Sequence, residues 1–243
     1  FQKQNFLFSA EFCFVRIPWI QGVLLREKMA KQTDKRQVPV ALQKILKADV
    51  YITNTLCNVM EKCLPFRSLK VHYKLLEVSC EGYIWLPGWL ILIWLIWKKE
   101  LMEMQVNFFI GLITDIIAVA VLKAIFRRRR PAGNQSDSLI QIGPDVYSFP
   151  SGHVSRSFYI AYFFLVLYPV YFLFRMPLLA WFVSVSVSRI LLRRHHLLDV
   201  LGGVLLGFIN SLLVALLWLS EDTAIYLISY ISDERIEGAD YHV

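Results

Sequence analysis

Charged residues are scarce in this 243-residue sequence, and their scarcity excludes a large class of proteins. Only 19% of the side chains are charged, whereas 56% are hydrophobic and the mean hydropathy is +0.49. Soluble globular domains carry about a quarter charged residues. The composition therefore excludes an ordinary soluble domain and points to a single membrane domain.

Cysteine is also scarce, and its spacing is uninformative for metals or disulfides. Cys13, Cys57, Cys63 and Cys80 form no close pair and no zinc-type spacing, so no disulfide framework is expected. We interpret them as small apolar residues, with palmitoylation of Cys57 or Cys63 as the alternative. Clusters of carboxylates or of His and Cys ligands are lacking too, so we expect no metal and no other cofactor.

The positive charge of the chain favours a lipid partner. The net charge is +7 and the pI is about 9.2, but the basic residues gather at the ends of apolar segments rather than on a soluble face. We therefore expect the bilayer and anionic lipid as partners, and no nucleic acid. The apolar stretch within residues 1–28 is interrupted by Glu11 and Arg16, which leaves secretion unsupported.

Five apolar runs approach the roughly 20 residues that a spanning helix needs; they are residues 75–97, 105–126, 154–174, 177–192 and 197–219. We predict an all-α, multi-pass transmembrane bundle of about five spans. Pro177 suits the first turn of the fourth span, and Gly202, Gly203 and Gly207 would let the fifth approach a neighbour closely. Residues 1–39 are expected to be a poorly ordered tail, 40–220 the membrane domain, and 221–243 an acidic tail.

Residues 40–64 have the pattern of an amphipathic helix. Their apolar stripe consists of Leu42, Ile45, Ile52, Leu56 and Val59, and Asp49 interrupts it. Such a helix could lie on a membrane surface, or it could pack against the rest of the bundle.

Three short motifs follow one another along the chain, each beside an apolar run; they are Lys123 with Arg130-Pro131, then Pro150-Ser151-Gly152-His153, then Ser188-Arg189 with His195 and Asp199. If the second to fifth spans alternate in direction, the span ends that carry these motifs lie on one side of the membrane. We therefore predict that the three motifs meet at one interface.

The motifs resemble the signature of the type 2 phosphatidic acid phosphatase superfamily, and every fixed position of that signature is filled. The stretches 127–132 and 147–153 look most like the branch that hydrolyses polyisoprenoid diphosphates, including presqualene diphosphate. The resemblance covers roughly residues 40–220. It departs from many family members in having five spans where they have six.

The motif residues have the chemistry to bind phosphate. Lys123, Arg130 and Arg189 supply fixed cations. Ser151 and Gly152 lie where the third span begins, so that backbone amides and the helix dipole can add donors toward the same oxygens. A metal is not needed if these groups stabilise the transferred phosphoryl group.

Two histidines supply the expected reaction steps. A neutral imidazole can attack phosphorus, and a carboxylate one helical turn away can hold its tautomer. Both His195 and His196 could reach Asp199, and the family spacing favours His195 as the nucleophile. His153 is then the proton donor to the leaving oxygen. The implied course is a phosphohistidine intermediate followed by attack of water.

Other charged residues leave alternatives open. Arg127, Arg128 and Arg129 could bind a second phosphate or could simply orient the helix in the membrane. Arg156 faces either the phosphate site or lipid headgroups. Asp115 lies in the middle of a span, and we expect it to form a buried hydrogen bond, with Ser184 or Ser186 as candidate partners.

The distribution of Lys and Arg predicts that the motifs face the cytoplasm. The sequon at Asn134 is then expected to stay unmodified, and the resemblance implies the endoplasmic reticulum and nuclear envelope. We carry three functional hypotheses: a lipid diphosphatase acting on isoprenoid diphosphates, a broader phosphomonoesterase acting on phosphatidate or sphingoid phosphates, and a non-catalytic membrane scaffold of the same fold. The sequence does not indicate the oligomeric state.

Overall fold

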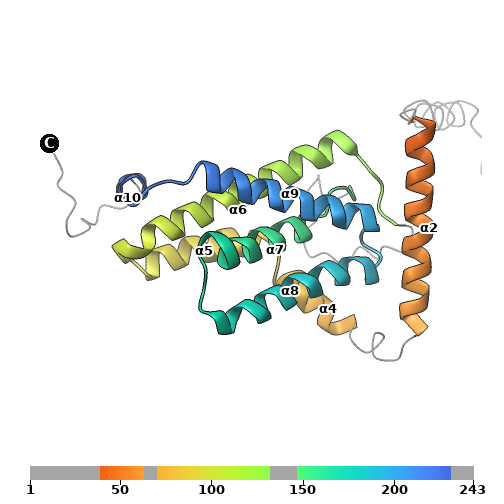
Figure 1. The fold of residues 1–243 in the computed structure, drawn as a ribbon, viewed down its shortest axis with the longest axis horizontal. Coiled ribbons are helices and arrows are strands. Elements are labelled where there is room, and N and C mark those ends of the chain that lie inside the picture. The colour runs from red at the N-terminus through yellow and green to blue at the C-terminus, as the bar shows by residue number, and fades with distance from the viewer. Residues whose placement is uncertain (1–38, 63–69, 132–146, 231–243) are drawn as a thin grey trace, which may run out of the picture. The chain divides into compact units, whose positions relative to one another are not determined.

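The computed structural model describes residues 39–62, 70–131 and 147–230. Its helices are α2 (Val40–Lys62), α4 (Lys70–Val78), α5 (Gly82–Leu95), α6 (Lys99–Phe126), α7 (Gly152–Tyr162), the π-helical turn η2 (Phe163–Leu167), α8 (Phe172–Leu191), α9 (Leu197–Leu216) and α10 (Glu221–Ser229) (Figure 1). The chain divides into two compact units at residue 45. Within the described part of the first unit, residues 40–45 are the start of α2; all that follows concerns the second unit, from Leu46 onward.

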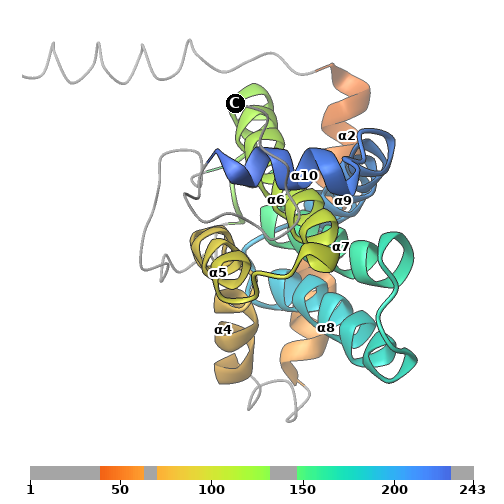
Figure 2. The same ribbon diagram turned by 90° about the vertical axis from the view of Figure 1, so that its left-hand side faces the viewer.

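The prediction of an all-α membrane bundle is confirmed, with fewer clear spans than expected. Among the described residues, α6, α8 and α9 are long and apolar enough to cross a bilayer. The segments His72–Val78 and Gly82–Leu95 make a fourth candidate if they count as one span, bent by 56°. Figure 1 shows α6, α8 and α9 with roughly aligned axes, and α9 runs opposite to α6 and α8. Figure 2 shows the same helices after a turn of 90° about the vertical axis.

Two differences from the predicted spans involve prolines. The run 154–174 is helical only as far as Leu167, because Pro169 disfavours helical geometry at Tyr168, whose φ and ψ are −131° and 78°. The next helix begins at Phe172, so Pro177 lies inside α8 and not in its first turn.

Helix α7 lies among α6, α8 and α9, with its most extensive contact against α9. Two glycines of α9 make this contact possible. A Cβ atom on Gly203 would lie 2.6 Å from the carbonyl oxygen of Ser151, and one on Gly207 would lie 2.5 Å from that of Ser155. The predicted close approach of the fifth span is therefore confirmed, and its partner is α7.

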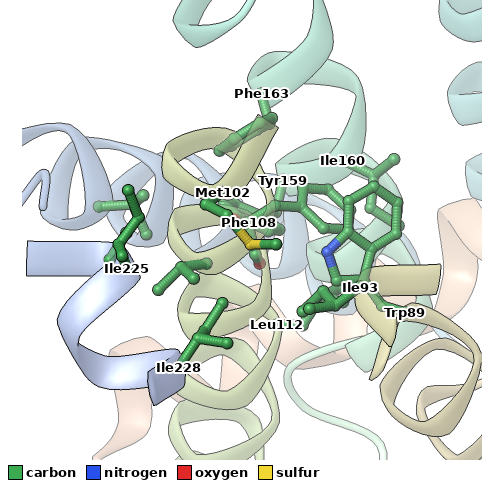
Figure 3. Close-up of a cluster of buried hydrophobic side chains, with 13 residues drawn as sticks. Trp89, Ile93, Met102, Phe108, Leu112, Tyr159, Ile160, Phe163, Ile225 and Ile228 are labelled. Atoms are coloured by element: carbon green, nitrogen blue, oxygen red, sulfur yellow. The ribbon is translucent and has the colours of Figure 1, made fainter. Parts of the chain in front are cut away.

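A cluster of aromatic side chains joins α5, α6 and α7 (Figure 3). Phe108 of α6 is fully buried, and its ring centroid lies 4.1 Å from that of Trp89, 5.0 Å from that of Phe163 and 5.7 Å from that of Tyr159. Ile225 and Ile228 of α10 belong to the same cluster. The packed bundle therefore extends into the predicted acidic tail as far as Ser229.

Helix α2 confirms the helix expected near 40–64, but its packing face is polar. Its buried residues are Asp49, Thr53 and Cys57, whereas Ile52 and Leu56 remain half exposed. The thiol of Cys57 donates to the carbonyl oxygen of Ile190 at 3.2 Å, and burial raises its pKa. Cys57 is therefore a small buried residue, as the first interpretation had it, and not a palmitoylation site. Cys63 lies outside the described residues.

We predict that Gly203→Ala destabilises the bundle by about 1–3 kcal/mol, because the added methyl group must displace backbone of α7. Thermal unfolding in detergent measures the change. Gly88→Ala in α5 is the matched control, since nothing lies within 4 Å of the added Cβ and the change in helix propensity is the same. Equal stability of the two variants would contradict the tight α7–α9 contact.

Candidate active site

The three motifs line one pocket at an end of the bundle. The end of α6, the start of α7, the turn between α8 and α9, and the bend between α4 and α5 all contribute to it. Its lining residues are Glu77, Glu81, Lys123, Arg130, Gly152, His153, Arg189, Arg194 and His195. The convergence predicted from alternating spans is therefore present in the structure.

The end of α6 brings two of the expected cations to the pocket. Lys123 lies in the last turn of α6 and is only 5% exposed. The helix stops at Arg127, which adopts a left-handed conformation with φ 49° and donates its N–H to the carbonyl oxygen of Lys123 at 3.0 Å. This stop turns the chain so that Arg130 also reaches the pocket.

The N-terminus of α7 faces the pocket, which Gly152 lines. Ser151 is the N-terminal cap residue of α7, and its N–H donates to the backbone carbonyl oxygen of Asp199 at 3.0 Å. Its Oγ atom is buried without a hydrogen-bond partner among the described residues. The positive end of the α7 dipole therefore points into the cationic pocket, beside an unused hydroxyl group.

Arg189 is the most deeply buried of the pocket cations, with 1% of its side chain exposed. Its Nη1 atom lies 3.3 Å from Oε1 of Glu77, whose Oε2 lies 3.4 Å from Nη2 of Arg194. Nη2 of Arg189 is buried and has no hydrogen-bond partner within the described ranges. One edge of this guanidinium is thus fixed by a carboxylate while a donor remains for an anion.

The predicted contact between His195 and Asp199 takes a different form. Helix α9 begins only at Leu197, so these residues do not share a helix face. Nδ1 of His195 lies 2.8 Å from the carbonyl oxygen of Ser148, and the hydroxyl group of Ser148 donates to Oδ2 of Asp199. Asp199 thus reaches the imidazole through Ser148. Its carboxylate contacts His196 directly, accepting from the backbone N–H at 2.8 Å and from Nδ1 at 3.2 Å.

These contacts define the state of the His195 ring. Because a carbonyl oxygen can only accept, Nδ1 carries the hydrogen and Nε2 keeps its lone pair. Burial of the ring, reinforced by the positive charge of Arg130, holds the pKa of His195 well below its ordinary value of about 6.5. The ring is therefore neutral at neutral pH and suited to nucleophilic attack.

His153 is paired with a carboxylate that the motifs do not include. Its Nε2 atom lies 3.3 Å from Oε1 of Glu81. One ligand atom from each of Glu77, Glu81 and His153 lies within 4.8 Å of the other two. Among the described residues, these three form the group whose spacing could hold a metal ion. The cations Lys123, Arg130 and Arg189 line the same pocket, and their charge disfavours a divalent cation there.

Sequence reasoning missed several residues around the site. The sequence offers a second phosphate or helix orientation for Arg128, but its Nη1 atom donates to Asp199 at 2.7 Å and its Nη2 atom to Asp49 of α2 at 2.5 Å. Ser148 precedes the Pro150 motif by two residues, which is the one signal that could have identified it. Glu77 and Glu81 lie outside the motifs, and only the fold brings them to the pocket.

The expectations for Asp115 and Arg156 need correction. Asp115 is buried, as predicted, but its partner is Ser155 of α7, not Ser184 or Ser186 of α8. Arg156 faces neither phosphate nor headgroups. It donates to the carbonyl oxygen of Cys80 at 2.8 Å, and its Nε atom lies 3.5 Å from Asp115, because two buried opposite charges stabilise each other.

We predict that His195 remains a neutral Nδ1–H tautomer at pH 6, since its lowered pKa places protonation well below 6.5. The 15N chemical shifts of histidine-labelled protein in detergent measure this, with His195→Gln identifying the signal. An imidazolium pattern for His195 at pH 6.5 would contradict the buried site.

Comparisons with known proteins identify the family. A family model described as the PAP2 superfamily matches residues 105–222, a range that contains all three motifs. A probable lipid phosphate phosphatase beta from Arabidopsis thaliana is 31% identical over 211 residues, covering 75% of this chain and 93% of that protein.

Two crystal structures are also similar. One is a transmembrane PAP2 type phosphatidylglycerolphosphate phosphatase from Bacillus subtilis, with a TM-score of 0.50 and 23% identity over 89% of this chain and 98% of that chain. The other is LpxE from Aquifex aeolicus, with a TM-score of 0.49 and 22% identity over 66% of this chain and 93% of that chain. The first shares the overall fold. With its apolar spans, the PAP2 match and its 31% identity to the Arabidopsis relative, the chain belongs to the PAP2 superfamily and is an integral membrane phosphoric ester hydrolase.

Proposed function

We propose that this protein hydrolyses lipid phosphates through a covalent phosphohistidine. The observation that carries the proposal is the single pocket that joins three buried or half-buried cations, the start of α7 and the rings of His153 and His195. A phosphate group needs such a set of fixed donors. The Arabidopsis relative, which is named as a lipid phosphate phosphatase, supports a lipid as the carrier of that phosphate.

The residues divide the reaction among them. Lys123, Arg130 and Arg189 bind the phosphate oxygens, and the hydroxyl group of Ser151 and the amide of Gly152 add donors. Nε2 of His195 attacks the terminal phosphorus, and the bond from that phosphorus to the leaving oxygen breaks; this is the bridging oxygen of a diphosphate, which leaves as the lipid monophosphate, or the lipid oxygen of a monoester. His153 gives its proton to that oxygen and later takes one from the water that attacks the phosphohistidine, which releases inorganic phosphate. Asp199 positions His195 through Ser148, and no metal takes part.

A diphosphate of a polyisoprenoid, such as presqualene diphosphate, is our preferred substrate. Arg194 adds a cation to the pocket beyond the three that the motifs supply, which favours a second phosphate. Arg128 does not contribute to that binding, because it is held between Asp49 and Asp199. A monoester such as phosphatidate or a sphingoid phosphate is the second candidate, favoured by the name of the Arabidopsis relative.

We further propose that the pocket faces the cytoplasm, in the endoplasmic reticulum and nuclear envelope. The excess of Lys and Arg in the N-terminal region and around the motifs supports this orientation. The sequon at Asn134, which lies outside the described residues, would then remain unglycosylated. An endoglycosidase-sensitive mass shift that disappears in Asn134→Gln would overturn the orientation.

We expect His195→Ala to lower phosphate release by at least about 10³-fold, because the nucleophile of a covalent mechanism is lost. Purified protein is assayed in detergent with a chelator present, against farnesyl, geranylgeranyl and presqualene diphosphates and phosphatidate. His72→Ala, which changes the exposed histidine of α4, is the control and keeps full activity. Unchanged turnover in His195→Ala would instead support the non-catalytic scaffold, and loss of wild-type turnover with chelator would contradict a metal-free reaction.

Arg128→Gln tests whether the hydrogen bond from Arg128 to Asp199 is needed for catalysis. We expect kcat to fall by about 10- to 100-fold with little change in KM, since a charge-assisted hydrogen bond contributes about 1.5–3 kcal/mol. Arg127→Gln is the matched control, because among the described residues that exposed side chain donates only to the carbonyl oxygen of Ala124. The same loss in both variants would mean that charge near the membrane, and not the Asp199 contact, is responsible.

A further inference from the structure

Helix α2 is anchored to the turn that carries His195. The backbone N–H of Leu197 donates to Oγ1 of Thr53 at 3.1 Å, and that of Leu198 donates to Oδ1 of Asp49 at 3.1 Å. These are two of the N–H groups at the start of α9 that no helical carbonyl can satisfy. Asp49 also binds Arg128 at 2.5 Å. Polar side chains of α2 therefore cap a membrane-spanning helix.

A second set of polar contacts fixes one flank of α2. Arg193, in the turn after α8, donates to Asn58 at 2.7 Å and to Glu61 at 3.2 Å. Asn54 and Glu61 lie on the same side of the helix as Asn58, given 3.6 residues per turn. This flank is thus the one that faces the charged turn.

The opposite flank of α2 is apolar and carries exposed aliphatic side chains. Ile52, Leu56 and Val59 lie along it and are 50%, 40% and 55% exposed. Val50 is also exposed, but it lies on the polar side of the helix. A soluble protein would leave such a row facing water at a cost, whereas a helix in a headgroup layer would bury it.

The attachment of α2 defines where this flank lies relative to the bilayer. Thr53 and Asp49 bind the first turn of α9, and Cys57 binds Ile190 in the last turn of α8; both helices are spans. The exposed side chains of Val187 and Leu201, one turn inside those ends, show that the lipid-facing surface of the spans reaches this level. In Figure 1 the part of α2 from Leu46 onward runs across the ends of α8 and α9 rather than alongside them.

We propose that α2 is an interfacial helix whose Ile52, Leu56 and Val59 flank binds the headgroup region of the bilayer. A helix that crosses the ends of spans lies parallel to the membrane surface, and its exposed Lys47 and Lys62 are suited to anionic lipid. Because α2 caps α9 beside the catalytic turn, the bilayer surface and the phosphate pocket are held at a fixed distance. The proposal concerns lipid contact and does not depend on which phosphate the pocket hydrolyses.

Photocrosslinking tests the proposal without relying on activity. A benzophenone amino acid replaces Leu56 in one variant and Lys47 in another, nine residues away and therefore on the opposite side of the helix. The full chain is placed in nanodiscs of phosphatidylcholine and phosphatidylserine and irradiated, and intact mass spectrometry counts lipid adducts. We expect an adduct yield about tenfold higher at Leu56 than at Lys47, as for an amphipathic helix in the interface.

Three outcomes are distinguishable. A lipid adduct preferred at Leu56 supports the proposal, and the same preference at Val59 serves where the Leu56 variant does not yield folded protein. Equal yields at Leu56 and Lys47 overturn it. Adducts at Leu56 with another protein or with a second copy of the chain, when native membranes are irradiated, also overturn it, because the flank would then be a protein interface.

Discussion

The buried carboxylate of Asp199 is the contact on which the site depends. It is fully inaccessible to solvent and accepts from Arg128, from the hydroxyl group of Ser148 and from the backbone and ring of His196. The carbonyl oxygen of the same residue accepts from the N–H of Ser151. A charge in this position would be costly without such donors. Meeting that requirement ties together the segment after α6, the segment before α7 and the start of α9.

The second constraint is the distance between α7 and α9. The glycines at 203 and 207 let the backbones meet, which brings the α7 dipole and His153 to the turn that bears His195. On its other side α7 is held by the buried pair of Asp115 and Arg156, and the thiol of Cys80 donates to the carbonyl oxygen of His153 at 3.1 Å. The position of the phosphate-binding end of α7 thus follows from contacts on two faces of that helix.

The sequence predicted the parts of the site that are local. Motif residues at helix ends could be placed because apolar runs define where spans stop, and the alternation of spans then put Lys123, His153 and Arg189 together. Asp199 and His195 could not be related correctly, because an i, i+4 relation holds only inside a helix and α9 starts two residues after His195. Residues such as Glu77 and Asp49 were beyond reach, since their partners lie far away along the chain and no periodicity records such contacts. The polar packing face of α2 is the clearest example: hydrophobic pattern alone would bury Leu56 and expose Asp49.

The two glutamates explain how so many cations can be buried close together. Arg189 and Arg194 both contact Glu77, and His153 contacts Glu81. Without these carboxylates the like charges would repel one another in a region of low dielectric. The carboxylates cannot neutralise the pocket, because Lys123 and Arg130 also line it and the positive charges outnumber the negative ones. Enough positive potential therefore remains to attract a phosphate dianion, while Nη2 of Arg189 and the hydroxyl group of Ser151 keep unused donors for its oxygens. The bend between α4 and α5, which supplies both glutamates, is thus as much a part of the phosphate site as the motifs themselves.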